Sequence, residues 1–133
     1  MYLNCHSYYS LRYGTMSVEK LVDEAVLSGV QALALTDINN STGIMEFIQV
    51  CTDKGIKPIA GIEFRREDEL LYVGLARNND GFRELNEFLS HHNLRNLPLP
   101  DHPPRMENVY WIHKLTISQT HKLTISSESS LRI

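Results

Sequence analysis

Short apolar segments of strand length alternate along this chain with segments that have the period of an amphipathic helix. The predicted strands are Tyr2–Cys5, Gln31–Thr36, Lys57–Phe64 and Leu70–Ala76, and the predicted helices run over 17–28, from Asn40 or Ser41 to Gly55, and onwards from about Asp80. Such an alternation, with roughly thirty residues in each repeat, is typical of consecutive right-handed βαβ units. The sequence therefore predicts the α/β class, with parallel strands in a sheet or barrel.

The helix predicted over 17–28 has the clearest pattern. Its apolar residues recur at spacings of three and four, which places them on one helix face; they are Val18, Leu21, Val22, Ala25 and Val26. Ser17 is suited to cap its N-terminus and Gly29 to end it. A different connection is predicted at the charged run 65–69, which forms a hairpin-like turn between two strands.

The length of 133 residues fits one domain. All seven glycines lie at or before Gly81, and four of the five prolines fall between Pro98 and Pro104. Residues 1–108 carry a net charge of −5, whereas residues 109–133 carry +2. We therefore predict a boundary at about 97–108.

Residues 109–133 contain one hexapeptide, HKLTIS, twice, at 113–118 and 121–126. A direct repeat of this kind favours out-of-frame or rearranged sequence, so we predict an unrelated and poorly ordered tail. The alternative is a genuine short hairpin, because the Leu and Ile residues of each repeat alternate with polar ones.

Composition and charge exclude several classes of protein. The net charge of −3 and the pI near 6.0 exclude a strongly basic surface that binds nucleic acid by phosphate neutralisation. No apolar run is long enough for a membrane span or a secretion signal. Cys5 and Cys51 are too few for a disulfide scaffold, so we expect reduced thiols and a cytoplasmic location.

Three polar residues follow or end successive predicted strands: His6, Asp37 and Glu63. Ligand sites of α/β folds form at the C-terminal ends of their strands. Together the three could supply nitrogen and oxygen ligands to zinc or manganese and activate water for phosphoester hydrolysis. The alternative is structural: Asp37 turns the chain into the next helix, Glu63 pairs with Arg65 or Arg66, and His6 is a loop residue with its own hydrogen bonds.

Four segments, in order, resemble the motifs of the PHP (polymerase and histidinol phosphatase) domain that opens the alpha subunit of bacterial DNA polymerase III. They are YLNCHSYYSLRYG at 2–14, ALTDINNSTG at 34–43, GIKPIAGIEF at 55–64 and LLYVGLARNNDGFREL at 70–85. The resemblance implies the N-terminal part of a distorted (β/α)7 barrel.

The departures from this family matter as much as the matches. Its metal-binding members carry histidines where this chain has Asn4, Ile38 and Leu71. His6, Asp37 and Glu63 remain as vestigial metal ligands. We therefore expect no catalytic residue and no resident cofactor, with at most weak binding of zinc or manganese.

The resemblance implies a truncated N-terminal fragment of a replicative DNA-directed DNA polymerase, a nucleotidyltransferase. The fragment lacks the polymerase active site, so by itself it is expected to be inactive and structural. The implied partners are the rest of the alpha subunit and a proofreading subunit, without direct nucleic-acid or membrane binding. The alternative is a small stand-alone metal-dependent phosphoesterase of the PHP class.

Overall fold

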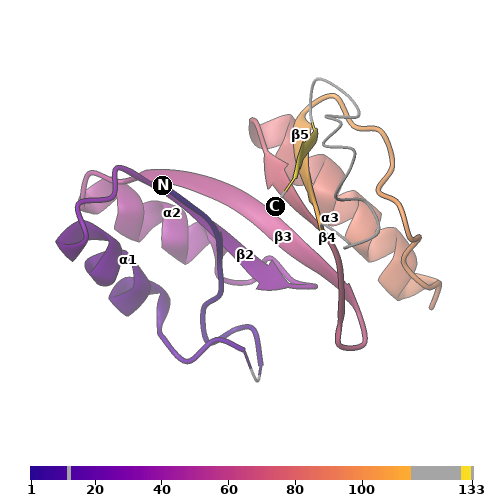
Figure 1. The fold of residues 1–133 in the computed structure, drawn as a ribbon, viewed down its shortest axis with the longest axis horizontal. Helices are drawn as coiled ribbons and strands as arrows, with labels where there is room; N and C mark the ends of the chain where they lie inside the picture. The colour runs from indigo at the N-terminus through magenta and orange to yellow at the C-terminus, as the bar shows by residue number, and fades with distance from the viewer. Residues whose placement is uncertain (12, 115–129, 133) are drawn as a thin grey trace.

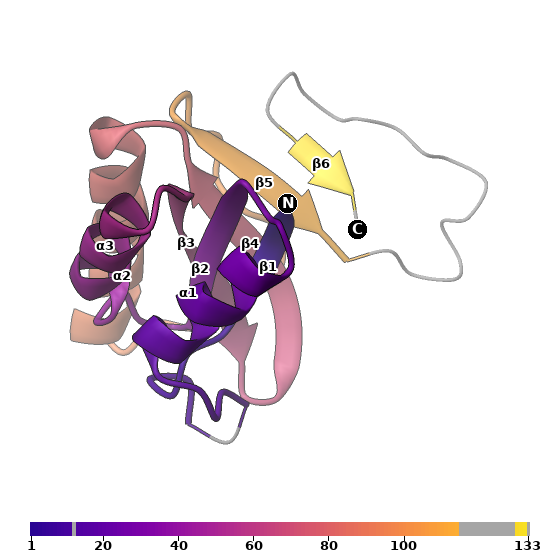
Figure 2. The same cartoon turned by 90° about the vertical axis from the view of Figure 1, so that its left-hand side faces the viewer.

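A computed structural model describes residues 1–11, 13–114 and 130–132. Its elements in chain order are β1 (Tyr2–Cys5), α1 (Val18–Leu27), β2 (Ala32–Ile38), α2 (Ile44–Asp53), β3 (Lys57–Arg66), β4 (Glu69–Ala76), α3 (Asn79–Leu94), β5 (Val109–His113) and β6 (Ser130–Arg132). The strands form one sheet in the order β1-β2-β3-β4-β5-β6. The sheet curls into a half-barrel, with the helices on its outer face (Figures 1 and 2).

The predicted α/β class is confirmed, but the sheet is mixed. β1, β2 and β3 are parallel neighbours, as expected of βαβ units. β4 pairs with β3 and β5 in antiparallel fashion, and β6 pairs parallel to β5. The antiparallel step arises at the hairpin predicted over 65–69, because only two residues separate β3 from β4, too few for the crossover that a parallel pair needs.

The core has two sides because side chains of a strand point alternately to opposite faces. On β2, Leu33 and Leu35 pack with α1 and α2 on the outer face. Ala34 lies in a separate cluster on the inner face, with Val73 of β4 and Ile112 of β5. Successive residues of β2 and β3 therefore lie alternately on the outer and inner faces. The same alternation determines the face on which each polar residue lies.

The helix ends agree only in part with the sequence. Ser17 caps α1, since its Oγ accepts a hydrogen bond from the backbone N–H of Lys20 at 3.2 Å. The cap predicted for the second helix is wrong, because Gly43 is the N-cap residue of α2 and provides no side-chain bond. An added Cβ at Gly43 would lie 2.8 Å from the Tyr9 ring, so this close approach favours glycine there.

The first residues of the predicted tail belong to the sheet. Val109–His113 form β5, and Trp111 is buried against Phe64 and Tyr72 with ring centroids 5.8 and 5.3 Å away. Residues 109–113 of the predicted tail are therefore a strand of the sheet, paired with β4 through a continuous apolar run. The repeats extend into 115–129, outside the described residues, so the disorder and origin of the tail stay predictions.

In the part of the chain that the structure describes, no helix has the length and apolar character needed to cross a bilayer.

Candidate functional site: a polar network at the strand ends

Two buried carboxylates lie at the C-terminal ends of β2 and β3. Asp37 is the penultimate residue of β2, and Glu63 is paired in register with the last residue of that strand, Ile38. His6 directly follows β1. Asp37 is 1% exposed and Glu63 is fully buried. Buried charges of this kind are costly unless hydrogen bonds compensate them.

The loop after β1 donates three hydrogen bonds to Asp37. Its Oδ1 accepts hydrogen bonds from the Ser7 backbone N–H and the Ser10 hydroxyl, each at 2.7 Å, and its Oδ2 accepts from the Ser7 hydroxyl at 2.7 Å. Ser10 Oγ in turn accepts from the backbone N–H of Ile38 at 2.9 Å. Asp37 therefore fastens the loop that follows β1 to the end of β2.

Glu63 is held by a second group of donors. Its Oε1 lies 3.0 Å from Asn4 Nδ2 and 3.0 Å from His6 Nε2, while Oε2 accepts from Arg65 Nε. Burial by itself raises the pKa of Glu63, but the bonds from His6, Arg65 and Asn4 outweigh it, and the net pKa is lowered. Glu63 is thus maintained as a carboxylate within the sheet.

Asparagine side chains extend this network. Asn4 accepts from the Thr36 hydroxyl at 2.6 Å through Oδ1, so it joins Glu63 to β2. Asn39, which has a positive φ of 50°, exchanges two bonds with the backbone of Arg65: its Nδ2 donates to the carbonyl at 2.8 Å, and its Oδ1 accepts from the N–H at 2.9 Å. Asn39 therefore continues the pairing of β2 and β3 beyond the last residue of β2.

Arg65 connects the network to neighbouring loops. Its guanidinium carbon lies 4.4 Å from the centroid of the Tyr13 ring. The Tyr13 hydroxyl donates to Asp68 at 3.1 Å, and Arg65 Nη1 donates to the Asp68 carbonyl at 3.3 Å. The hairpin between β3 and β4 is thereby attached to the loop after β1.

The three residues singled out in the sequence do not converge on one point. Glu63 and His6 are in contact, whereas Asp37 lies on the outer face with Leu35 and Glu63 lies on the inner face, opposite to Phe64. Among the described residues, no three His, Cys, Asp or Glu side chains are grouped to hold a metal ion. Each oxygen of the two carboxylates accepts at least one hydrogen bond from the protein. The vestigial metal site stays a prediction.

Sequence reasoning missed most of the partners in this network. Ser7, Ser10, Thr36 and Asn39 were not singled out, and Asn4 was noted only as a replaced histidine. The ion pair offered as an alternative for Glu63 is present, with Arg65 as the partner. A usable signal for the others was the presence of Ser, Thr and Asn at strand ends, where their side chains bond readily to nearby backbone.

The geometry defines a class: an α/β half-barrel whose strand ends are joined by a hydrogen-bonded polar network. The PHP domain family model matches residues 3–128, so the chain belongs to the PHP domain family.

Curated relatives agree with this assignment. DNA polymerase III subunit alpha of Chlamydia trachomatis is 39% identical over 90 residues, which cover 68% of this chain and 7% of the relative. The same subunit of Treponema pallidum is 37% identical over 99 residues, covering 64% of this chain and 8% of the relative. An error-prone DNA polymerase of Symbiobacterium thermophilum is 36% identical over 90 residues, which cover 68% of this chain and 8% of the relative. The chain thus spans less than a tenth of the length of these relatives.

Solved structures support the fold alone. A protein assigned as a metal-dependent phosphoesterase, from Bifidobacterium adolescentis, superposes with a TM-score of 0.55 at 21% identity, covering 71% of this chain and 32% of the other. An amidohydrolase from Chromobacterium violaceum gives a TM-score of 0.51 at 23% identity, with 70% and 34% covered.

Proposed function

We propose that this chain is the N-terminal region of a degenerate PHP domain from a DNA polymerase III alpha subunit, in which the former metal site has become a structural joint. It contributes to DNA replication by supporting the polymerase body, and it does not itself catalyse nucleotide addition. The proposed partners are the remainder of the alpha subunit and a proofreading subunit.

The observation that carries this proposal is that every oxygen of both buried carboxylates accepts a hydrogen bond from the protein. All four carboxylate oxygens of Asp37 and Glu63 accept hydrogen bonds from the chain itself. A catalytic metal site needs these oxygens to face a common cation and a water molecule. Here each carboxylate instead joins neighbouring strand ends, on opposite faces of the sheet.

The residues that replace histidines support the same proposal. Asn4 bridges Glu63 and Thr36, which gives this position a structural use that needs no metal. Ile38 offers an aliphatic side chain and cannot ligate. The likeness of the sequence to polymerase alpha subunits supports the replicative assignment over a stand-alone phosphoesterase.

The test measures metal content, hydrolysis and stability on the same protein. After dialysis against buffer containing zinc or manganese, followed by metal-free buffer, the chain is expected to retain much less than one ion per molecule. Hydrolysis of p-nitrophenyl phosphate should not exceed the background rate. Asp37→Asn and Glu63→Gln should lower the melting temperature and leave the metal content and the hydrolysis rate unchanged.

The contrary result is well defined. Stoichiometric metal that survives dialysis, disappears in Asp37→Asn or Glu63→Gln, and supports hydrolysis would establish the phosphoesterase alternative. The exposed Glu46→Gln is the matched control, since it changes the same chemical group on the surface of α2.

A further inference from the structure

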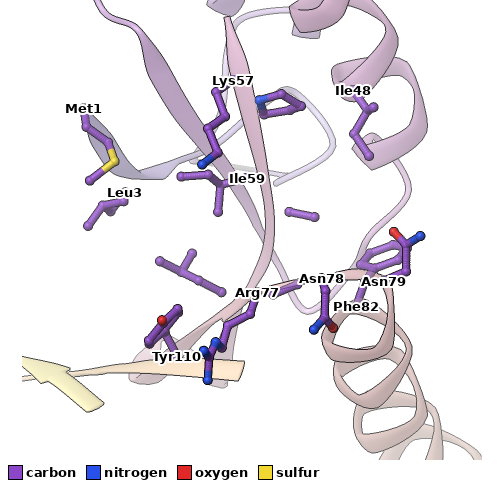
Figure 3. A pocket seen from close by; sticks show the side chains of 14 residues that line it. Met1, Leu3, Ile48, Lys57, Ile59, Arg77, Asn78, Asn79, Phe82 and Tyr110 are labelled. Carbon is purple, nitrogen blue, oxygen red and sulfur yellow. The ribbon is translucent and has the colours of Figure 1, made fainter. Parts of the chain in front are cut away.

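A pocket of about 510 Å³ lies at the other end of the sheet, around the first residues of β3 (Figure 3). Its walls come from β1, α2, β3, β5 and the junction between β4 and α3. The volume falls in the range of small-molecule sites, about 300–1,000 Å³. The pocket is remote in the fold from Glu63, because it is formed where β3 begins and β4 ends.

Most of the pocket lining is apolar. Leu3, Ile48, Ile59, Leu75 and Phe82 are among its apolar lining residues. In Figure 3, Ile48 and Phe82 lie on one side of the β3 ribbon, and Leu3 and Ile59 lie on the other. Such surface gains free energy when an apolar molecule displaces water from it.

The charged groups of the lining all have one sign. Lys57 and Arg77 line the pocket, and none of the fourteen lining residues is Asp or Glu, although the whole chain has a net charge of −3. In the view of Figure 3, Ile59 lies between these two cationic side chains. Because the lining has two cationic side chains and no carboxylate, its electrostatic potential favours an anion.

Arg77 is held in position before any ligand arrives. Its guanidinium carbon lies 4.9 Å from the centroid of the Tyr110 ring, and its Nη1 donates to the Glu107 carbonyl at 3.1 Å. The guanidinium has five donors, so others remain available to an anion. The first turn of the 16-residue helix α3 adjoins the pocket through Asn78 and Asn79 and adds a positive dipole end.

We propose that this pocket binds a small amphipathic anion: a molecule with an extended apolar body and one carboxylate or similar anionic group, which Lys57 and Arg77 attract from either side of Ile59. An anion without an apolar body leaves the apolar walls hydrated, and a neutral molecule of the same shape leaves the cations without a partner. Affinity therefore requires both parts of the ligand. The site uses no residue of the polar network, so a test of this binding site is independent of the structural role proposed above.

The experiment uses the 133-residue chain and three probes: decanoate, decanol and inorganic phosphate. Two-dimensional NMR titration monitors the backbone amides of the pocket and of the polar network in the same spectra. Decanoate should shift the amides of Lys57, Ile59, Ala60 and residues 75–79 in a saturable way. Decanol and phosphate should bind at least tenfold more weakly.

Substitutions of the cations separate the proposed site from nonspecific adsorption. Lys57→Gln and Arg77→Gln should each weaken decanoate binding at least fivefold. Lys20→Gln and Arg105→Gln, which remove exposed cations outside the pocket, should not change it. Lys57 is itself exposed, so its variant remains informative if Arg77→Gln fails to fold.

Four results would overturn the proposal. Three of them are equal affinity for decanoate and decanol, equal weakening by the control variants, and shifts that do not map to the pocket. Loss of the shifts in a self-associated form of the chain would also overturn it, since a second copy would then be the occupant.

Discussion

At the C-terminal ends of β2 and β3, every oxygen of the two buried carboxylates accepts a hydrogen bond, whereas the beginning of β3 borders a cavity of about 510 Å³. Both regions are built on the same strands. The difference follows from the side chains, because buried charge must find partners with defined geometry, while apolar surface has no such requirement. The polar end is therefore well defined, and the apolar end can stay hollow.

The largest effect is expected from Glu63→Ala. This change removes the partner of Arg65, His6 and Asn4 inside the protein, and breaking such a buried ion pair typically costs about 3–5 kcal/mol. Chemical denaturation should therefore show a large fall in the free energy of unfolding, with no change in the metal content. The exposed Glu87→Ala on α3 serves as control, with an expected change within about 0.5 kcal/mol. Equal free energies of unfolding for the two variants would contradict a stabilising role for the buried polar network.

Asp37→Ala should have the next largest effect, about 2–3 kcal/mol, because it leaves the donors of Ser7 and Ser10 without their acceptor. A double-mutant cycle with Ser10→Ala measures the coupling directly. We expect a coupling energy of about 1 kcal/mol or more for two contacting groups. Strict additivity would mean that the 2.7 Å bond between Ser10 and Asp37 contributes nothing to stability.

A smaller effect is expected at the hollow end. Phe82 and Phe88 lie on the same helix and are both partly buried, but Phe82 lines the cavity and Phe88 packs on Phe64 and Trp111. Phe82→Ala should cost about 1 kcal/mol, and Phe88→Ala about 2–3 kcal/mol, since fewer packing contacts are lost beside existing empty space. Thermal and urea unfolding of both variants tests this order. A larger loss for Phe82→Ala would indicate that the cavity is filled in solution.

The smallest effect concerns pH. The pKa of Glu63 is below its ordinary value of 4.5, so its contribution to stability is present above that value and is lost as pH falls through the lowered pKa. Between pH 7 and pH 5 this residue should therefore add no slope to the free energy of unfolding. Below about pH 4.5, wild type should lose stability more steeply than Glu63→Gln. Parallel curves for the two proteins over this acid range would contradict the lowered pKa.

Local pattern was enough to predict much of the fold. The bounds of β1, the Ser17 cap and the hairpin at 65–69 depend on neighbours in sequence, and the structure has all three. The antiparallel addition of β5 after a long proline-containing connection could not be predicted in this way. Its partner residues on β4 lie 33 to 41 positions earlier, from Ala76↔Val109 to Tyr72↔His113, and the pairing depends on burial of Trp111 against distant aromatic residues.

By itself, the sequence determined which polar residues stand at the strand ends: His6, Asp37 and Glu63. Only the tertiary structure decided which of them meet. The parallel register pairs Ile38 with Glu63. Because side chains alternate along a strand, Asp37 then lies on the opposite face. There it accepts hydrogen bonds from Ser7 and Ser10, which lie on a loop some thirty residues earlier in the sequence. A shift of register by one residue would exchange the two faces, and no local property of these residues determines that register.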